Sequence, residues 1–303
     1  MDVIDLFAGC GGMSLGFQQA GHNIVLAVEN WDKALECYTE NFNHQALSHD
    51  LTQVNDTVNL LTPYEFDLII GGPPCQDFSH AGSRVEGLNA NLTVAFAEIV
   101  CALHPPCFVF ENVDRAQKSE SYRKAKAVFT VAGYTLTEVV LNASRCGVPQ
   151  NRKRFFAIGT THNPEGQLEV LIENGLDEHP MTIRQYLGNA LGIEYYYRHP
   201  RNYNRRGIFS VDEPSPTIRG VNRPIPAGYS LHHGDPVQSL DGVRPLTTRE
   251  RAILQTFPAD FILTGSKTNQ EQMIGNAVPV NMASYLARCI DLHYQNIQRG
   301  VEE

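Results

Sequence analysis

The 303-residue sequence predicts an α/β fold: a Rossmann-like, mostly parallel sheet with helices on both faces, plus a small loop-rich domain. Two observations lead to this prediction. Over the first 160 residues, short apolar runs typical of buried strands alternate with helix-like segments, which is the pattern of a parallel sheet. From about residue 181 to 243, periodicity weakens and Pro, Gly, Asn, Arg and Tyr accumulate.

The individual elements follow from apolar spacing and from turn residues at their ends. The predicted strands are Val3 to Leu6, Asn23 to Val28, Phe66 to Ile70, Cys107 to Phe110, Tyr134 to Leu141 and Phe155 to Gly159. The predicted helices are Met13 to Ala20, Asp32 to Asn41, Leu92 to Leu103, Ser119 to Ala132, Thr248 to Thr256 and Val280 to Leu292. Asp32 is the predicted N-cap of its helix. Ligands of such sheets lie beyond the carboxyl ends of the strands, where the motifs described below occur.

Composition excludes several classes of protein. No N-terminal apolar segment and no apolar run near about 18 residues is present, so the chain is expected to be neither secreted nor membrane-spanning. The seven cysteines form no Cys-x-x-Cys pair, which argues against a disulfide framework and a structural zinc site. We therefore expect a cytoplasmic protein without a bound metal.

The net charge of −9 is unevenly distributed. Residues 1–70 contain ten acidic residues and a single basic one, Lys33. Basic residues concentrate in 144–154 and in 195–223. Such concentration is expected of a surface that faces phosphates, although a solvated charged face would give the same pattern.

One cysteine has an unusual setting, in the run Gly71-Gly72-Pro73-Pro74-Cys75-Gln76-Asp77-Phe78-Ser79. Proline fixes φ and removes a backbone donor, so the paired prolines would hold Cys75 in a stiff, extended presentation just after a strand. A nucleophile that must meet one atom of a substrate needs such placement. A buried cysteine beside a tight turn is the simpler alternative.

The predicted cofactor end of the sheet begins with Asp5-Leu6-Phe7-Ala8-Gly9-Cys10-Gly11-Gly12, between the first strand and the first helix. Glycines there allow a ligand to approach a helix N-terminus. The dinucleotide pattern Gly-x-Gly-x-x-Gly fails at Ser14, which makes a nicotinamide-dependent oxidoreductase the weaker interpretation. Glu29 could accept both ribose hydroxyls and Asp50 an adenine amino group. These acids suit a cationic nucleoside cofactor without phosphates, such as S-adenosylmethionine.

Six motifs, in order along nearly the whole chain, resemble the bacterial-type DNA (cytosine-5) methyltransferase family. The first two are the glycine loop of residues 5–12 and Pro73-Pro74-Cys75-Gln76. The other four are Glu111-Asn112-Val113, Gln150-Asn151-Arg152-Lys153-Arg154, Arg244-Pro245-Leu246-Thr247 and Gly275-Asn276-Ala277-Val278-Pro279. The pattern departs at Asn30, where the family usually stacks an apolar or aromatic residue on adenine and where Trp31 comes one position later. It also departs at Asn89, where many members have arginine.

The resemblance implies methyl transfer from S-adenosylmethionine to C5 of a cytosine flipped out of duplex DNA, through a covalent bond between Cys75 and C6. The implied catalytic residues are Cys75, Glu111, Arg152 and Arg154. Glu111 would bind N3 and the exocyclic amine, whereas a carboxylate that only caps a loop is the structural alternative. The implied cofactor-binding residues are Asp5, Phe7, Ala8, Gly9, Gly11, Gly12, Glu29, Asn30, Asp50, Pro74, Leu92, Asn276 and Ala277. The implied DNA-binding residues are Gln76, Ser79, Arg198, Arg201, Arg205, Arg206, Thr217, Arg219 and Arg223.

The same resemblance implies a catalytic and cofactor-binding domain at 1–180, a target-recognition domain and hinge at 181–275, and a returning C-terminal segment at 276–303. Arginine can read guanine and asparagine adenine, which fits the recognition segment. The tyrosines at 195–197 are expected to pack rather than stack on bases. We expect a monomer that binds double-stranded DNA and is functionally paired with a restriction endonuclease or acts without one.

Two other functions stay open at this point. Relatives that methylate transfer RNA typically carry Cys-Phe-Thr, whereas this chain has Cys107-Phe108-Val109. A catalytically silent DNA-binding relative would be expected to lack Cys75, Glu111 or the cofactor loop, and all three are present.

Overall fold

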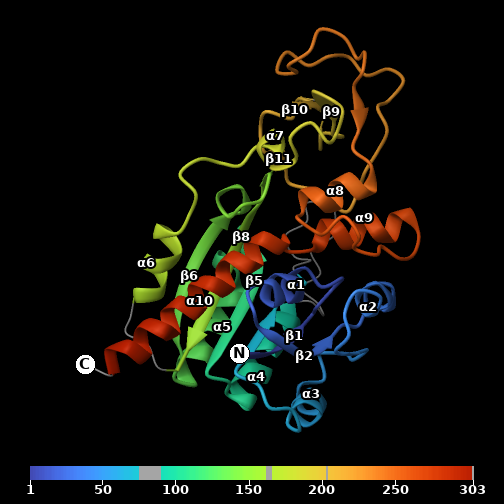
Figure 1. Cartoon of the computed structure of the whole chain (residues 1–303). Helices are drawn as coiled ribbons and strands as arrows, with labels where there is room; N and C mark the ends of the chain where they lie inside the picture. The colour runs from blue at the N-terminus through green and yellow to red at the C-terminus, as the bar shows by residue number, and fades with distance from the viewer. Residues whose placement is uncertain (75–89, 162–165, 203, 302–303) are drawn as a thin grey trace.

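The computed structural model describes residues 1–74, 90–161, 166–202 and 204–301 (Figure 1). Its main feature is a seven-stranded sheet in the order β3-β2-β1-β4-β5-β8-β6. The strands are β1 Asp2–Leu6, β2 Asn23–Val28, β3 Gln45–Leu47, β4 Leu68–Gly71, β5 Cys107–Val113, β6 Thr135–Asn142 and β8 Lys153–Thr160. Strand β8 is antiparallel to both of its neighbours, so the other six strands run in one direction. The predicted α/β, mostly parallel fold is confirmed.

Helices cover both faces of this sheet, because alternate residues of each strand are apolar on opposite sides. On one face, Val3 and Leu68 belong to a core that includes α1 Gly12–Gln19, α6 Gln167–Asn174 and α10 Val280–Val301. On the other, Ile4 and Ile69 pack with α3 Val54–Leu61, α4 Ala90–Leu103 and α5 Glu120–Val131. Helix α2 Asp32–Thr39 belongs to a third core, shared with the C-terminal part of the chain.

The strands end level with one another, which brings their loops to one edge. Leu6 of β1 pairs with Val28 of β2 and Gly71 of β4, and Gly71 pairs with Phe110 of β5. Because β8 runs the other way, it is its first residues that lie at this edge, with Arg154 opposite Val113. The loops after β1, β2, β4 and β5 and the start of β8 therefore meet.

A smaller assembly stands beyond that edge (Figure 1). Its three-stranded sheet has the order β10-β9-β12, with β9 Tyr195–Tyr197, β10 Ile208–Ser210 and β12 Arg244–Pro245. A two-stranded pairing of β7 Gln150–Asn151 with β11 Ser215–Pro216 connects it to the main body. The helices of this part are α7 Ile183–Leu187, α8 Thr248–Leu254 and α9 Lys267–Asn276, and the short 3₁₀ turns η1 Asp114–Lys118 and η2 Ala143–Arg145 lie in the main body.

The predicted elements are found with shifts of a few residues at their ends. One prediction was wrong: the N-cap of α2 is Trp31, and Asp32 is the first helical residue, where its negative charge still faces the positive end of the helix dipole. Helix α10 extends beyond the predicted Leu292 to Val301. The packing role of the tyrosines is confirmed for Tyr196 and Tyr197, which are each 1% exposed. Strand β3, helices α3, α6, α7 and α9, and the short strands β7 and β9–β12 were not predicted.

Among the described residues, no helix is long and apolar enough to cross a membrane. The described residues also contain no cluster of three or more His, Cys, Asp or Glu side chains able to hold a metal ion. The domain boundaries at residues 180 and 275 stay predictions, and the second one falls in the last turn of α9.

Candidate active site

The loop after β1 has the backbone of a ligand cradle. Phe7 and Gly9 both have positive φ, 60° and 57°, and Gly11 has φ 92°. A side chain at Gly9 would point into open space, whereas one at Gly11 would collide with the ring of Phe42. The positive φ of Phe7 is strained for a residue with a side chain, and backbone strain of this kind concentrates at ligand sites. The loop thus has room beside Gly9 for a bound molecule.

Glu29, the residue after β2, holds this loop in place. One of its carboxylate oxygens accepts the backbone N–H of Gly9 at 2.7 Å, and the other accepts that of Trp31 at 2.7 Å. Both partners are neutral amides, so the negative charge of Glu29 is stabilised without being neutralised. Each oxygen has a further lone pair, which a ribose hydroxyl could occupy.

Asp5 lies under the loop and is 1% exposed. Its carboxylate accepts a hydrogen bond from the Ser14 hydroxyl at 2.6 Å, and the Tyr38 hydroxyl donates to Ser14 Oγ at 2.7 Å. Burial raises the pKa of Asp5 to about 7, opposed by the Ser14 hydrogen bond and reinforced by the charge of Glu29. A carboxyl group this easily protonated would be stabilised as an anion by a nearby cation.

The other predicted cofactor residues surround the same edge. Asp50 is exposed, and hydrogen bonds from the backbone and hydroxyl of Thr52 lower the pKa of its carboxyl group. Asn30 and Pro74 are exposed, and Leu92 is half-buried in the first turn of α4. These positions are compatible with the predicted roles.

The C-terminal motif returns to the glycine loop. A side chain at Gly12 would collide with the carbonyl oxygen of Val278, and one at Gly16 would collide with Ala283 of α10. These two small residues on one face of α1 therefore let the 277–283 segment pack directly against it. Asn276 and Ala277 are thereby brought to the base of the predicted cofactor loop.

Glu111 and Arg154 form an ion pair at the same edge of the sheet. Glu111 is the fifth residue of β5 and is 8% exposed, and its Oε1 lies 2.9 Å from Arg154 Nε. Burial raises the pKa of Glu111, while the positive charges of Arg154 and Arg152 oppose the shift. A carboxyl group poised in this way can hold a proton while substrate fills the site, which the proposed contact with cytosine N3 requires.

Arg152 has a different environment from the one predicted. It is fully buried, and its guanidinium donates to the carbonyl oxygens of Ile218 at 3.0 Å and of Gly275 and Ala277 at 2.9 Å each. Burial lowers its pKa, as does the charge of Arg154. Arg152 thus joins the recognition segment to the C-terminal motif. The predicted role of Arg152 in orienting the base stays a prediction. Arg152 would act on the base only through the effect of its positive charge on Glu111.

Asn112 was overlooked in the sequence as a residue with a role of its own. Its side-chain amide donates to the carbonyl oxygen of Pro73 at 3.1 Å and so joins the end of β5 to the chain that leaves β4. Only its place beside Glu111 could have drawn attention to it. The predicted nucleophile Cys75, the predicted DNA contacts Gln76 and Ser79, and the atypical Asn89 lie outside the described residues.

The arginines predicted to bind DNA fall into two groups. Arg198 and Arg219 are half-buried, and each donates to a backbone carbonyl, those of Thr217 and His199 respectively. Burial, then the charges of neighbouring arginines, lower the pKa of Arg198 to about 10. Arg201, Arg205 and Arg223 are exposed.

Arg206 and Thr217 are held by other parts of the protein. Arg206 forms an ion pair with Glu213 and lies 4.3 Å from the centre of the Phe209 ring. The Thr217 hydroxyl donates to the carbonyl oxygen of Asn151 at 2.7 Å, across the β7–β11 pairing. Of the predicted DNA-binding set, these two have the most evident structural roles.

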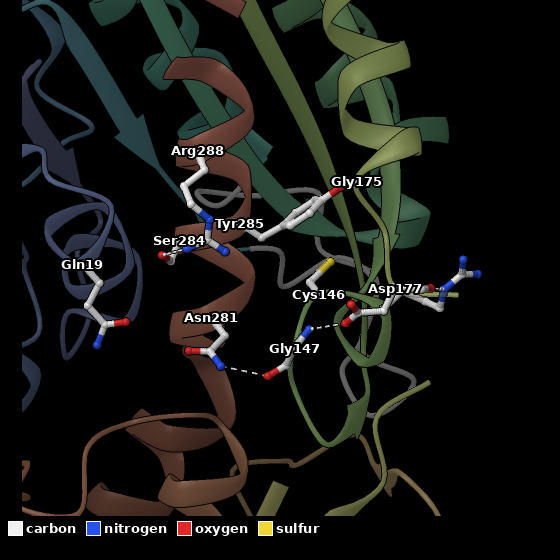
Figure 2. Close-up of a pocket in the computed structure, with 10 residues that line it drawn as sticks. Gln19, Cys146, Gly147, Gly175, Asp177, Asn281, Ser284, Tyr285 and Arg288 are labelled. Atoms are coloured by element: carbon white, nitrogen blue, oxygen red, sulfur yellow. Dashed lines mark hydrogen bonds between the residues drawn. The ribbon is translucent and has the colours of Figure 1, made fainter. Parts of the chain in front are cut away.

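A cavity of about 470 Å³ lies elsewhere, between α10 and the turn after β6 (Figure 2). Asn281 donates to the Gly147 carbonyl at 2.8 Å, and the Gly147 N–H donates to Asp177 at 3.2 Å. None of the residues predicted to bind cofactor, base or DNA lines this cavity. The catalytic edge is therefore identified by its side chains and not by the volume of a cavity.

Comparison with known protein families agrees with this arrangement. The family model for C-5 cytosine-specific DNA methylases matches residues 1–291. The chain belongs to this family. It is a DNA (cytosine-5) methyltransferase with S-adenosylmethionine as methyl donor, and the resemblance drawn from the six motifs is confirmed.

Curated relatives match along nearly the whole enzyme. The type II methyltransferase M.HgiDI of Herpetosiphon aurantiacus is 54% identical over 294 residues, covering 97% of this chain and 95% of the relative. The type II methyltransferase M.HindV of Haemophilus influenzae is 54% identical over 292 residues, covering 96% of each chain.

Solved structures share the fold at low sequence identity. The Dnmt2 methyltransferase of S. pombe has a TM-score of 0.70 at 18% identity, over 98% of this chain and 99% of that one. The methyltransferase EhMeth of Entamoeba histolytica has a TM-score of 0.67 at 14% identity, over 98% of both chains.

Proposed function

We propose that this enzyme is the sequence-specific modification methyltransferase of a type II restriction-modification system, acting on one cytosine in a short duplex site. The printed names of the relatives that are 54% identical support the type II assignment. The observation that carries the chemistry is the Glu111–Arg154 pair, which lies at the same sheet edge as the glycine loop and the Pro73-Pro74 entry to Cys75. We expect the enzyme to act as a monomer in the cytoplasm.

The chemistry divides between the side chains as follows. The Cys75 thiolate would add to C6 of the flipped-out cytosine, which makes C5 nucleophilic enough to take the methyl group supplied by S-adenosylmethionine. Glu111 would hold N3 and the exocyclic amine and share a proton as charge develops on the ring. Arg154 would keep Glu111 oriented. Loss of the C5 proton and cleavage of the bond between sulfur and C6 would then restore the aromatic ring and free Cys75.

The cofactor would occupy the space beside Gly9, where backbone N–H groups and a glycine without a side chain leave a cradle. The ribose would bind Glu29 and the adenine amino group Asp50. The charge pattern supports this placement. The Glu29 carboxylate accepts hydrogen bonds from neutral amides, and Asp5, whose pKa burial raises to about 7, would be stabilised as an anion by a sulfonium.

DNA would bind across the arginine-rich assembly beyond the sheet edge. The half-buried Arg198 and Arg219 are held in place by carbonyl oxygens, and such preorganised guanidiniums suit base reading. The exposed Arg201, Arg205 and Arg223 suit phosphate contacts, which position the protein without reading sequence.

Bisulfite sequencing of a plasmid from methylation-deficient cells that express the enzyme tests this proposal. We expect protection of one cytosine within one short sequence, and no protection when the cells express Cys75→Ala. Full protection with Cys75→Ala would contradict the assigned nucleophile. Protection of no DNA sequence by soluble, folded enzyme would contradict the proposed substrate and direct the same assay to cellular RNA.

A further inference from the structure

A chain of hydrogen bonds leads from the buried Asp5 towards the surface. Ser14 Oγ donates to Asp5 Oδ2 at 2.6 Å, and the Tyr38 hydroxyl donates to Ser14 Oγ at 2.7 Å. The same Tyr38 hydroxyl lies 2.6 Å from His44 Nε2. Asp5, Ser14 and Tyr38 are each at most 1% exposed, whereas His44 is half-buried. Of the four side chains in this chain, His44 is therefore the one that solvent reaches.

The chain can satisfy its members in two directions. When Asp5 is an anion, Ser14 donates to it and Tyr38 donates to Ser14, so the Nε2–H of His44 donates to the Tyr38 oxygen. When Asp5 is protonated, the order can reverse, with Asp5 donating to Ser14 and Ser14 to Tyr38. The Tyr38 hydroxyl then donates to a bare Nε2, and His44 carries its proton on Nδ1. Both charge states of Asp5 are thus compatible with a complete set of hydrogen bonds.

The pKa values along the chain make Asp5 the group that changes its charge near neutral pH. Burial raises the pKa of Asp5 to about 7, although the hydrogen bond from Ser14 opposes the shift. Burial also raises the pKa of Tyr38, so its hydroxyl can pass on a proton without becoming an anion. Burial lowers the pKa of His44, which favours a neutral imidazole that can carry its proton on either nitrogen.

The other titratable groups near Asp5 come from the glycine loop and from the elements beside it. The negative charge of Glu29, which follows β2, raises the pKa of Asp5 further. Burial raises the pKa of Cys10 in the loop and of Cys37 in α2, so both thiols stay neutral. A cation bound beside the loop would therefore act on Asp5, because it offsets both the burial and the repulsion from Glu29.

We propose that this chain is a proton path, which couples the binding of S-adenosylmethionine to the loss of one proton from Asp5. The inference rests on the proposed function, which places the cofactor beside Gly9. With a cation bound there, the carboxylate of Asp5 becomes the favoured form. Its proton passes to Ser14 Oγ, the Ser14 proton passes to the Tyr38 oxygen, and the Tyr38 proton passes to His44 Nε2. The proton on His44 Nδ1 then leaves to water, so one proton is released in total.

The alternative is a static network that only stabilises the packing of α1 against α2. The enzyme offers a matched control for that role in Tyr122, which is also 1% exposed and donates to Glu138 at 2.7 Å between α5 and β6. Loss of either hydroxyl is expected to lower thermal stability. The Tyr38 hydroxyl, in contrast to that of Tyr122, is linked to Asp5.

The coupling is tested by measuring the dissociation constant of S-adenosylmethionine at pH 5.5, 6.5 and 7.5 in the full-length enzyme. Fluorescence of Trp31 reports binding, because it is the single tryptophan and its backbone N–H donates to Glu29. Calorimetry at pH 6 in two buffers of different ionisation enthalpy counts the protons released. The same measurements are made on Asp5→Asn, Tyr38→Phe and the control Tyr122→Phe.

For the parent enzyme we expect the dissociation constant to fall by a factor approaching about 10 from pH 5.5 to 6.5, with release of about one proton at pH 6. Asp5→Asn should bind without this pH dependence and without this proton. Tyr38→Phe should shift the profile to higher pH by about 0.5–1 unit, the equivalent of one ordinary hydrogen bond, because the Tyr38 hydroxyl strengthens the bond from Ser14 to the carboxylate. Tyr122→Phe should keep the parent profile.

The path is tested by His44→Gln, whose amide can donate to Tyr38 but cannot pass on a proton. In stopped-flow mixing, this variant should bind S-adenosylmethionine more slowly than the parent at pH 6, where Asp5 has to lose its proton. At pH 8, where Asp5 is largely ionised beforehand, the two rates should agree.

The possible failures are distinguishable. A pH-independent dissociation constant in the parent enzyme would overturn the coupling. Parent-like behaviour of both Tyr38→Phe and His44→Gln would overturn the proton path. Absence of S-adenosylmethionine binding by the folded parent at every pH would instead contradict the proposed function.

Discussion

The two ends of the catalytic edge hold charges of opposite sign by the same means. At the cofactor end, Asp5 and Glu29 accept hydrogen bonds from a hydroxyl and from backbone amides. At the recognition end, Arg152 and Arg198 donate to backbone carbonyls. In both places these partners are neutral dipoles, which orient an ionisable group without neutralising its charge.

That difference shows why the net charge of the whole chain says little about its ligands. A charge held by dipoles is oriented but not cancelled, and it stays available to a ligand of opposite sign. The acidic end suits a sulfonium and the basic end suits a nucleic acid, although the chain as a whole carries −9. Glu111, which faces Arg154 directly, lies where the two ends meet.

Replacing Glu111 is expected to have the largest effect, because it removes the acid at this meeting point. Glu111→Gln keeps the shape of the side chain but cannot supply a proton, and general acid catalysis is typically worth about 10²–10⁴-fold. We expect kcat to fall by that factor, with an unchanged dissociation constant for S-adenosylmethionine in equilibrium titration. Glu138→Gln is the control, since Glu138 accepts a hydrogen bond from Tyr122 at 2.7 Å on β6 and is not part of the site. A large loss of cofactor affinity in Glu111→Gln would assign Glu111 to the cofactor end.

The sequence was sufficient to predict those site residues whose position is set by the strand they belong to or directly follow. Glu29 directly follows β2, and Glu111 lies in the last three residues of β5, which extends beyond the predicted Phe110 to Val113. Both lie at one edge because level strand ends follow from a parallel sheet. The roles of Arg152 and Asn112 could not be predicted this way, because their partners Ile218, Ala277 and Pro73 are far away in the sequence. Side chains on opposite ends of a long connection become neighbours only when the chain has folded.

A second prediction concerns the pH dependence of stability that Asp5 produces at the cofactor end. The carboxyl pKa is 3.8 as its ordinary value and about 7 in the buried site, where Glu29 is a charged neighbour. Well below pH 3.8 Asp5 is protonated in both the folded and the unfolded state. Between 3.8 and about 7 the unfolded state has released the proton, whereas the folded state still holds it. The parent enzyme should therefore lose stability relative to Asp5→Asn as pH rises.

Urea unfolding of the two proteins at pH 5 and pH 8, without cofactor, measures this effect. The difference in the free energy of unfolding between Asp5→Asn and the parent should shift in favour of the variant by at most about 3 kcal/mol between these pH values. A difference that is constant with pH would mean that Asp5 is already ionised in the folded enzyme. The folded enzyme would then carry the negative charge of Asp5 without a loss of stability before any cation binds.

The smallest effect is expected at the basic end, where the exposed arginines would contact phosphates. Each phosphate contact contributes about 0.9 to the slope of log affinity against log salt concentration, so Arg201→Gln with Arg223→Gln should reduce this slope by about 2. Arg184→Gln is the matched control, because Arg184 already forms ion pairs with Glu194 and Asp212. Fluorescence anisotropy with a duplex containing the target site, over a salt series, gives the three slopes. Equal slopes in the parent enzyme and both variants would mean that Arg201 and Arg223 do not contact phosphates, and the attraction of the basic end for DNA would rest on its other arginines.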